Sequence, residues 1–391
     1  MIGVTSPSKY ENATPNREPM STFTPTPATE INLLPEPTPL AVSLAAPLAS
    51  YHGVLTPQQF DAEEAETRAL LQSAAVHDLG WLRRIAVRGE DRFRWLSGMV
   101  TNAVESLPLQ SGAYNLVLNA QGRIQGDVYI WREGDGIELE IAADQSEALL
   151  AHFDRFIVMD DVELVPRSDQ SAIGLTGPQA DRILESLGLD ALSEPLTCVH
   201  AVIDGMAIRL FRTYGAAVPH YAIWAKSDQI PQLWQVILAA GATPVGSEAL
   251  EALRIVEGIA TFGIDVQSRD LPQETSLLRA LSFTKGCYLG QEIVERIRSR
   301  GQVHRHLRHL ELTLDDPSTP LPARSTELRK PDSVATVKAL GELSSVTSVK
   351  LGESRRVFAL AMIRAEAEVG SKTLTFPGGS AQILNTAPNF E

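Results

Sequence analysis

The chain has 391 residues, of which 44% are hydrophobic and 21% charged, a composition typical of a globular protein with more than one domain. Its 48 acidic and 34 basic residues give a net charge of −14, which disfavours sequence-independent binding to nucleic acid or to an anionic membrane. Two cysteines, Cys198 and Cys287, are too few for a disulfide framework or a four-thiolate metal site. No apolar run reaches the ~18 residues that a spanning helix needs. These features favour a cytoplasmic protein without a metal site.

The first fifty residues differ in composition from the rest of the chain. They hold nine prolines, interleaved with threonine, serine, asparagine and glutamate. Such a segment has too little apolar surface to offset the entropy of ordering it. We therefore predict a disordered leader over residues 1–50.

Residues 51–302 alternate short strands with single helices. A helix over 62–75 precedes a first round of elements, and a second round with a similar pattern follows it. The first round has strands at 84–88, 114–118, 127–131 and 137–141 with helices at 90–100 and 146–156, and the second has strands at 172–175 and 221–225, a hairpin over 198–211, and helices at 178–187 and 231–240. Hairpins mixed with single helices predict an α+β fold of ferredoxin-like sub-domains. No G-x-G-x-x-G follows a strand, so a dinucleotide-binding fold has no support.

From about residue 303 the pattern changes to short strands separated by proline, glycine and serine. The strands are expected at 309–314, 345–350, 357–363 and 372–376. This spacing is typical of a small β-barrel, which we predict for residues 303–391.

The segment Lys285 to Glu292 (KGCYLGQE) has the most unusual composition in the chain. Its two glycines permit close approach of the backbone to a ligand, and Lys285 is placed to stabilise a thiolate at Cys287. A helix is expected over 291–300, with Arg296 and Arg300 in a basic stripe. The alternative interpretation is a buried cysteine beside a solvated helix face.

This segment, with Arg296 and Arg300 after it, resembles the signature of the YgfZ-type folate-binding proteins. These proteins are relatives of the aminomethyltransferase (T-protein) of the glycine cleavage system. The resemblance extends to segments on both sides of the signature, namely 96–102, 118–127, 254–258, 262–265, 271–274, 341–348 and 358–363.

The resemblance implies sub-domains arranged around a central channel that holds tetrahydrofolate. Members of the YgfZ branch are implicated in the assembly or repair of iron–sulfur enzymes and are linked to tRNA modification, so the implied partners are iron–sulfur client or assembly proteins. In T-proteins the same pocket transfers a methylene group from an aminomethyl-lipoyl carrier to tetrahydrofolate. T-proteins do not carry the thiol of the signature, so Cys287 favours the YgfZ branch.

The resemblance also assigns residues. Asp127 matches an acidic residue near the reactive folate nitrogens, and Cys287 and Lys285 join it as candidate catalytic residues. The candidate folate-binding residues are Asp127, Glu274, Tyr288, Gln291, Glu292, Arg296 and Arg300. Val256 occupies the position of a T-protein glutamate that binds the pterin, with Glu257 one place later, and this departure weakens the case for T-protein catalysis.

Three functions are therefore weighed. The leading one is a tetrahydrofolate-binding accessory factor for iron–sulfur proteins that uses Cys287. The alternative is an aminomethyltransferase or related one-carbon transferase. A tRNA-binding module that uses Arg296, Arg300 and Arg305 ranks last because the chain is acidic.

Overall fold

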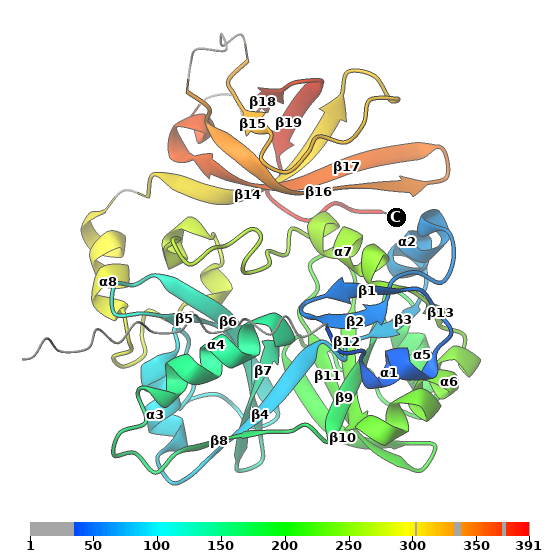
Figure 1. Cartoon of the computed structure of the whole chain (residues 1–391), viewed down its shortest axis with the longest axis vertical. Coiled ribbons are helices and arrows are strands. Elements are labelled where there is room, and N and C mark those ends of the chain that lie inside the picture. The colour runs from blue at the N-terminus through cyan, green and yellow to red at the C-terminus, as the bar shows by residue number, and fades with distance from the viewer. Residues whose placement is uncertain (1–34, 302, 332–337, 370–372, 391) are drawn as a thin grey trace, which may run out of the picture. The chain divides into compact units, whose positions relative to one another are not determined.

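The computed structural model describes residues 35–301, 303–331, 338–369 and 373–390 (Figure 1). Between residues 35 and 58 lie three short elements: α1 (Pro39–Ser43), β1 (Leu48–Tyr51) and β2 (Val54–Pro57). The Thr38 hydroxyl accepts a hydrogen bond from the amide of Ala41 and so caps α1. Leu40 is completely buried. Residues 35–50 thus have defined structure where the sequence predicts a disordered leader, and the part of that leader before residue 35 lies outside the described residues.

A large mixed sheet is built from two rounds of elements with the same order. The first round comprises β4 (Leu82–Arg88), α3 (Arg92–Met99), β5 (Ser111–Leu118), β6 (Ile124–Glu133), β7 (Gly136–Ala142), α4 (Ala143–Asp154) and β8 (Glu163–Pro166). The second comprises β9 (Gln170–Thr176), α5 (Ala180–Ser186), β10 (Thr197–Ile203), β11 (Met206–Thr213), β12 (His220–Lys226), α6 (Ile230–Ala239) and β13 (Thr243–Pro244). The two rounds expected from the sequence are both present.

The strand order shows how the two rounds are joined. The first round runs β5-β6-β7-β4-β8, and the second runs β10-β11-β12-β9, followed by β3 (Ala75–Asp78) and β13. The rounds meet edge to edge where Thr197 of β10 pairs with Ser111 of β5. The sheet curls so that β4 also contacts β9. The result is one continuous sheet that nearly closes into a barrel.

Each round buries its own apolar core. In the first, Trp95 and Leu96 of α3 and Phe153 of α4 pack with the buried side chains of β4 to β7. In the second, α6 places Leu233 and Ile237 on one face, four residues apart, against β9, β11 and β12. In each round, helices therefore cover one face of the central strands.

The C-terminal strands form a second, antiparallel sheet. They are β14 (Arg305–Leu314), β15 (Glu327–Leu328), β16 (Gly341–Leu351), β17 (Ser354–Arg364), β18 (Thr373–Phe376) and β19 (Gly379–Ile383), in the order β15-β16-β17-β14-β19-β18. Arg329, directly after β15, exchanges two backbone hydrogen bonds of 2.9 Å with Thr375 of β18. These bonds join the two ends of the sheet.

Two helices connect the barrel to the large sheet. They are α2 (Glu63–Gln72) and α7 (Ser247–Val256), and both contact β16. Their buried side chains share one apolar cluster with Val349 and Phe358 of the barrel. Arg254 of α7 donates a hydrogen bond of 3.0 Å to the hydroxyl of Ser345 in β16. Among the described residues, no helix has both the length and the apolar character needed to cross a membrane.

Candidate functional site

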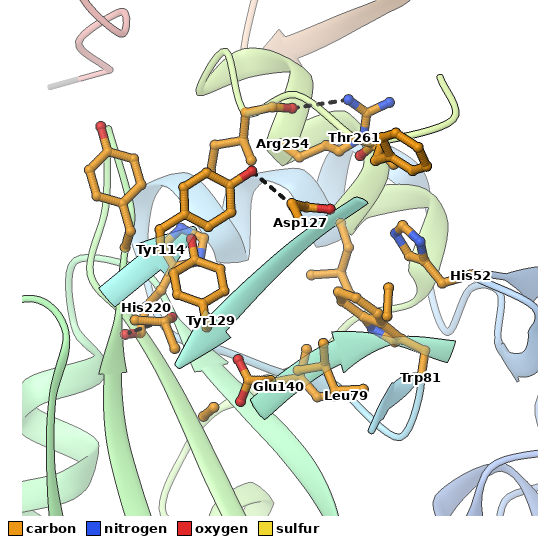
Figure 2. Close-up of a pocket in the computed structure, with 18 of the residues that line it drawn as sticks. His52, Leu79, Trp81, Tyr114, Asp127, Tyr129, Glu140, His220, Arg254 and Thr261 are labelled. Carbon is orange, nitrogen blue, oxygen red and sulfur yellow. Dashed lines mark hydrogen bonds between the residues drawn. The ribbon is translucent and has the colours of Figure 1, made fainter. Parts of the chain in front are cut away.

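A cavity of about 230 Å³ opens between the large sheet, α7 and the N-terminal hairpin, which is formed by the antiparallel strands β1 and β2 (Figure 2). A single water needs only ~10–15 Å³ on such a measure, so the cavity is large enough for an organic molecule. Its wall is rich in aromatic rings, among them Tyr51, Trp81, Tyr114 and Tyr129. This combination of volume and aromatic lining is typical of a site for a flat ligand.

Asp127 lies in this cavity with both carboxylate oxygens held. Tyr114 of β5 donates a hydrogen bond of 2.8 Å from its hydroxyl to Oδ2, and Gln145 of α4 donates one of 2.9 Å from Nε2 to Oδ1. The side-chain oxygen of Gln145 also accepts a hydrogen bond from the amide of Asp127. Burial raises the pKa of Asp127, although both hydrogen bonds oppose that rise. The geometry therefore fixes an acidic group that is easier to protonate than an exposed aspartate.

Within the described part of the chain, the buried donors without an acceptor include two in the cavity wall. Nε1 of Trp81 and Nε of Arg279 are buried, and neither has a hydrogen-bond acceptor among the described residues. The guanidinium of Arg279 lies over the rings of Tyr114 and Tyr214, with its carbon 4.9 and 4.2 Å from their centroids. Buried donors without acceptors are costly, so a ligand that offers acceptor atoms here would be stabilised.

The N-terminal hairpin supplies part of the wall. The chain turns between β1 and β2 at His52 and Gly53, where φ is 46° and 83°, and a glycine tolerates such a conformation at little cost. The imidazole of His52 stacks on the indole of Trp81 with 4.4 Å between the ring centroids, and Nδ1 of His52 lies 3.1 Å from Oδ2 of Asp144. Tyr51 packs edge-on against the same indole. Residues 51 and 52 are thus held against the sheet by contacts with two later segments.

The loop that carries Cys287 packs against the end of α3. Lys285 donates hydrogen bonds from Nζ to the carbonyls of Ser97 and Val100, at 2.5 and 2.6 Å, and burial lowers its pKa to about 8. Tyr288 is buried, with the Lys285 ammonium 4.9 Å from the centre of its ring. Cys287 is exposed. The loop therefore presents the thiol to solvent while its lysine caps the carbonyl end of a helix.

The basic helix after this loop is α8 (Gln291–Arg300). Gly290 caps its N-terminus, with φ at 82°, and a β-carbon there would lie 2.6 Å from the carbonyl oxygen of Asn119. The side chain of Gln291 accepts a hydrogen bond from the amide of Tyr288. Glu292 and Arg296 are exposed, and the side chain of Arg300 lies outside the described part of the chain. The glycine at position 290 is therefore required by both backbone conformation and close packing.

Glu274 is engaged in an ion pair with the barrel. Its carboxylate accepts hydrogen bonds of 2.8 Å from Nε of Arg305 and from the amide of Leu271. Arg305 also donates a hydrogen bond to Asp270 at 2.8 Å. This arrangement ties the start of β14 to the segment that precedes the cysteine loop.

Of the residues predicted for the site, Asp127 lines the cavity. Among the described residues, the lining includes neither Glu274 nor any residue of 285–296. The roles predicted for Cys287, Lys285, Glu274, Tyr288, Gln291, Glu292, Arg296 and Arg300 stay predictions. Val256 is completely buried in the core shared with the barrel, whereas Glu257 lines the cavity.

Several lining residues were not singled out from the sequence. They include Trp81, Tyr114, Gln145, His220 and Arg279. The alternation of side chains along a strand would have indicated Tyr129, which shares a face of β6 with Asp127. The others come from distant segments and carry no comparable signal in the sequence.

Comparisons with known proteins agree with this architecture. The family model described as the GCVT N-terminal domain matches residues 39–285. An aminomethyltransferase of Rubrobacter xylanophilus is 28% identical over 66% of this chain and 71% of its own length. A putative chloroplastic transferase of Arabidopsis thaliana is 26% identical over 89% of this chain and 78% of its own.

A solved structure shares the fold. The glycine cleavage system aminomethyltransferase T of Bartonella henselae superposes with a TM-score of 0.77 at 17% identity, covering 91% of this chain and 99% of that one. The family model covers more than half of the 391 residues. The chain therefore belongs to the GCVT N-terminal domain family.

Proposed function

We propose that this protein binds tetrahydrofolate in the cavity and transfers a one-carbon unit to it, in the manner of an aminomethyltransferase. The observation that carries the proposal is the buried carboxylate of Asp127, which Tyr114 and Gln145 fix in an aromatic cavity. Membership of the family and the aminomethyltransferases among the relatives support it.

The residues of the cavity fit a reduced folate chemically. Its pterin is flat and suits a wall that contains Tyr114, Tyr129 and Trp81. Its ring oxygen and nitrogen acceptors suit the donors Nε1 of Trp81 and Nε of Arg279, which are buried without partners. When bound, tetrahydrofolate supplies the nucleophilic nitrogens that accept the one-carbon unit.

Asp127 has two roles in this proposal. Its carboxylate orients a folate N–H by accepting its hydrogen bond, and it holds a proton when one is released nearby. Because burial raises its pKa, the carboxyl group binds a proton more readily than an exposed aspartate does. Tyr114 and Gln145 keep the carboxylate in one orientation, which removes the entropy cost of positioning it for each reaction.

The test is a calorimetric titration of tetrahydrofolate into the wild type and into Asp127→Ala. Loss of a hydrogen bond to a charged group is expected to weaken binding by about 10- to 100-fold. Asp169→Ala, at a largely exposed position on another segment, is the matched control and should bind like the wild type. An absence of tetrahydrofolate binding by the wild-type protein would refute the proposal.

Transfer itself needs a second assay. The protein should form the methylene derivative of tetrahydrofolate from a lipoylated carrier that bears an aminomethyl group. Turnover in this assay supports the transferase. Tight folate binding without turnover would instead favour an accessory factor.

The accessory factor for iron–sulfur proteins remains the second candidate because Cys287 is exposed on its loop. In that case Cys287 meets a client or assembly protein, and the folate cavity serves a separate step. Cys287→Ala should then abolish complementation of a strain that lacks the protein while leaving folate affinity unchanged. Retained complementation would exclude a function of the thiol.

A further inference from the structure

A second pair of titratable side chains lines the same cavity. Glu257 follows the last residue of α7, and its side chain is fully buried. One carboxylate oxygen, Oε1, accepts hydrogen bonds from the amides of Ala217 and Val218, at 2.8 and 3.2 Å. Burial acts to raise the pKa of Glu257, but His220 and the two amides outweigh it, and the pKa is lowered. Glu257 is therefore a carboxylate at neutral pH.

The second oxygen of this carboxylate faces a histidine. Nε2 of His220, the first residue of β12, lies 3.0 Å from Oε2 of Glu257. Both atoms are buried, and neither has a well-aligned hydrogen-bond partner among the described residues, so their approach to within 3.0 Å of each other is the polar contact that each makes. A carboxylate requires a donor, so this contact places the ring proton on Nε2. In the neutral imidazole, Nδ1 then carries the lone pair.

The ring is accessible from the cavity. His220 lines the cavity, is labelled in Figure 2, and has 18% of its side chain exposed. Since Nε2 is occupied by Glu257, Nδ1 is the nitrogen left for a bound molecule. The pair thus has the arrangement of a base oriented by a buried carboxylate.

The other ionisable groups around His220 are less suited than His220 to act as a base. The pKa of His77 on β3 is lowered to about 3, mainly by burial and to a smaller extent by the nearby His220. His77 is therefore neutral. Its Nε2 lies 3.0 Å from the hydroxyl of Thr176, the cross-strand neighbour of His220. The remaining acidic and basic side chains among the described lining residues are His52, Asp127, Glu140, Arg254 and Arg279. Of these, Glu140 is paired with Arg84 at 3.0 Å, and Arg254 with Asp265 at 2.8 Å.

We propose that His220 is a second catalytic residue of the cavity and transfers a proton to and from the amine of the transferred group. Nδ1 takes one proton from the ammonium of the aminomethyl unit, which leaves the nitrogen lone pair free and converts the imidazole to imidazolium. The bonds from the methylene carbon to the carrier sulfur and to the amine nitrogen then break as the carbon forms two bonds to tetrahydrofolate nitrogens. Of the two N–H protons that tetrahydrofolate loses, one goes to the carrier thiolate and one to the amine nitrogen, which leaves as ammonia. The proton held by the imidazolium then converts this ammonia to ammonium. Glu257 is the positioning residue, because it fixes the tautomer and balances the charge of the imidazolium. The identity of the amine rests on the function proposed above.

The tautomer can be measured without any ligand. In the full-length protein labelled with ¹⁵N, the spectrum at pH 8 should show His220 protonated at Nε2 and unprotonated at Nδ1. In Glu257→Gln, the amide oxygen can still accept from Ala217 and Val218, but the amide NH₂ donates to Nε2 and moves the proton to Nδ1. A wild-type His220 protonated at Nδ1 would overturn the proposal, even if tetrahydrofolate binds.

The kinetic test separates chemistry from binding. His220→Gln should lower kcat for aminomethyl transfer by about 100-fold, without a measurable change in the Kd of tetrahydrofolate. His306→Gln is the control, because His306 pairs with Glu368 at 2.7 Å in the barrel and does not line the cavity. An unchanged kcat, or a kcat that falls only as the protein unfolds, would contradict the role of His220. Failure of the wild type to bind folate would refute the proposed function but leave the tautomer result standing.

Discussion

Asp127 and Glu257 are two carboxylates of one cavity, yet they are held in different ways. Asp127 receives its hydrogen bonds from the side chains of Tyr114 and Gln145, and burial raises its pKa. Glu257 receives two from backbone amides and contacts His220, and its pKa is lowered. Burial alone therefore does not decide the protonation state. The identity of the partners does.

The difference suggests a division of labour. A carboxyl group that protonates easily suits proton exchange with a ligand, whereas one fixed as an anion suits support of a neighbouring base. The following predictions test whether this division is real, beginning with the largest expected effect.

Asp127→Asn should lower kcat for one-carbon transfer by about 10²- to 10⁴-fold, because asparagine cannot hold the transferred proton. Steady-state kinetics with saturating tetrahydrofolate measures it. The same change at Asp144, which pairs with His52 beside the cavity, is the control and should cost far less. Equal losses at the two positions would mean that Asp127 has no special role.

Glu257→Gln should reduce the free energy of unfolding by about 1–3 kcal/mol, because the contact with His220 and the two amide hydrogen bonds lose their negatively charged acceptor. Urea denaturation at pH 7 measures the change. Glu368→Gln provides a comparison at a more exposed histidine partner, and a smaller loss is expected there. A Glu257 variant as stable as the wild type would show that the pair is not an important support of the fold.

Lys285→Met should cost about 1 kcal/mol of stability, since the carbonyls of Ser97 and Val100 lose their donor. Folate affinity should not change, because Lys285 does not line the cavity. Thermal unfolding and calorimetry on the same samples separate the two effects. Weaker folate binding at unchanged stability would instead place this lysine at the ligand.

A smaller effect concerns the pH dependence of stability. The pKa of Asp127 is higher in the folded protein than in the unfolded chain, so its contribution is present at low pH and is lost as pH rises through the folded value. Glu257 has the opposite shift, and its contribution is lost as pH falls through its lowered pKa. Between pH 4 and 8, Asp127→Asn should therefore gain stability relative to the wild type as pH rises, and Glu257→Gln should not. Parallel pH curves for both variants would remove the distinction between the carboxylates.

Cys287→Ala should have the smallest effect on the folded protein, within about 0.5 kcal/mol of wild-type stability, because the side chain is exposed. Cys198→Ala offers the contrast, since Cys198 is buried beside Phe211 and should cost more. Chemical denaturation of both variants tests the difference. A large loss on changing Cys287 would show a structural role for the thiol.

The periodic parts of the fold could be predicted from the sequence. Each round of strands and helices has local patterns of apolar residues, and both rounds appear at nearly the expected positions. The edge-to-edge pairing of β5 with β10 and the contact of β4 with β9 could not be predicted, because they join segments distant in sequence. Strand order depends on such long-range contacts rather than on propensity.

The structure of residues 35–50 was hidden by their composition. Thr38 and Pro39 together form a typical helix start, with a hydroxyl cap and a proline in the first turn. The surrounding prolines obscured this signal. What stabilises the segment is tertiary, since Leu40 is buried in the core of the second round and the Thr38 hydroxyl donates to Asp78.

The site was predictable only in part for a similar reason. The family resemblance singled out Asp127, which lines the cavity, but could not identify Tyr114 and Gln145 as its hydrogen-bond partners, which come from a neighbouring strand and a later helix. Val256 and Glu257 show most clearly what the sequence could not predict, because the resemblance matched position 256 to a pterin-binding glutamate, whereas the glutamate that lines the cavity is residue 257. Val256 ends α7 inside the core, and the next residue leaves the helical face and turns into the cavity.

The hairpin that carries Tyr51 and His52 has consequences for how a ligand enters and leaves the cavity. A two-stranded hairpin of four residues per strand has little stability of its own and depends on its contacts with Trp81 and Asp144. Local opening of this element should therefore require less free energy than unfolding of the central sheet. Its amides are expected to exchange with deuterium sooner than those of β6 or β12, and a ligand that packs against Tyr51 should slow them selectively.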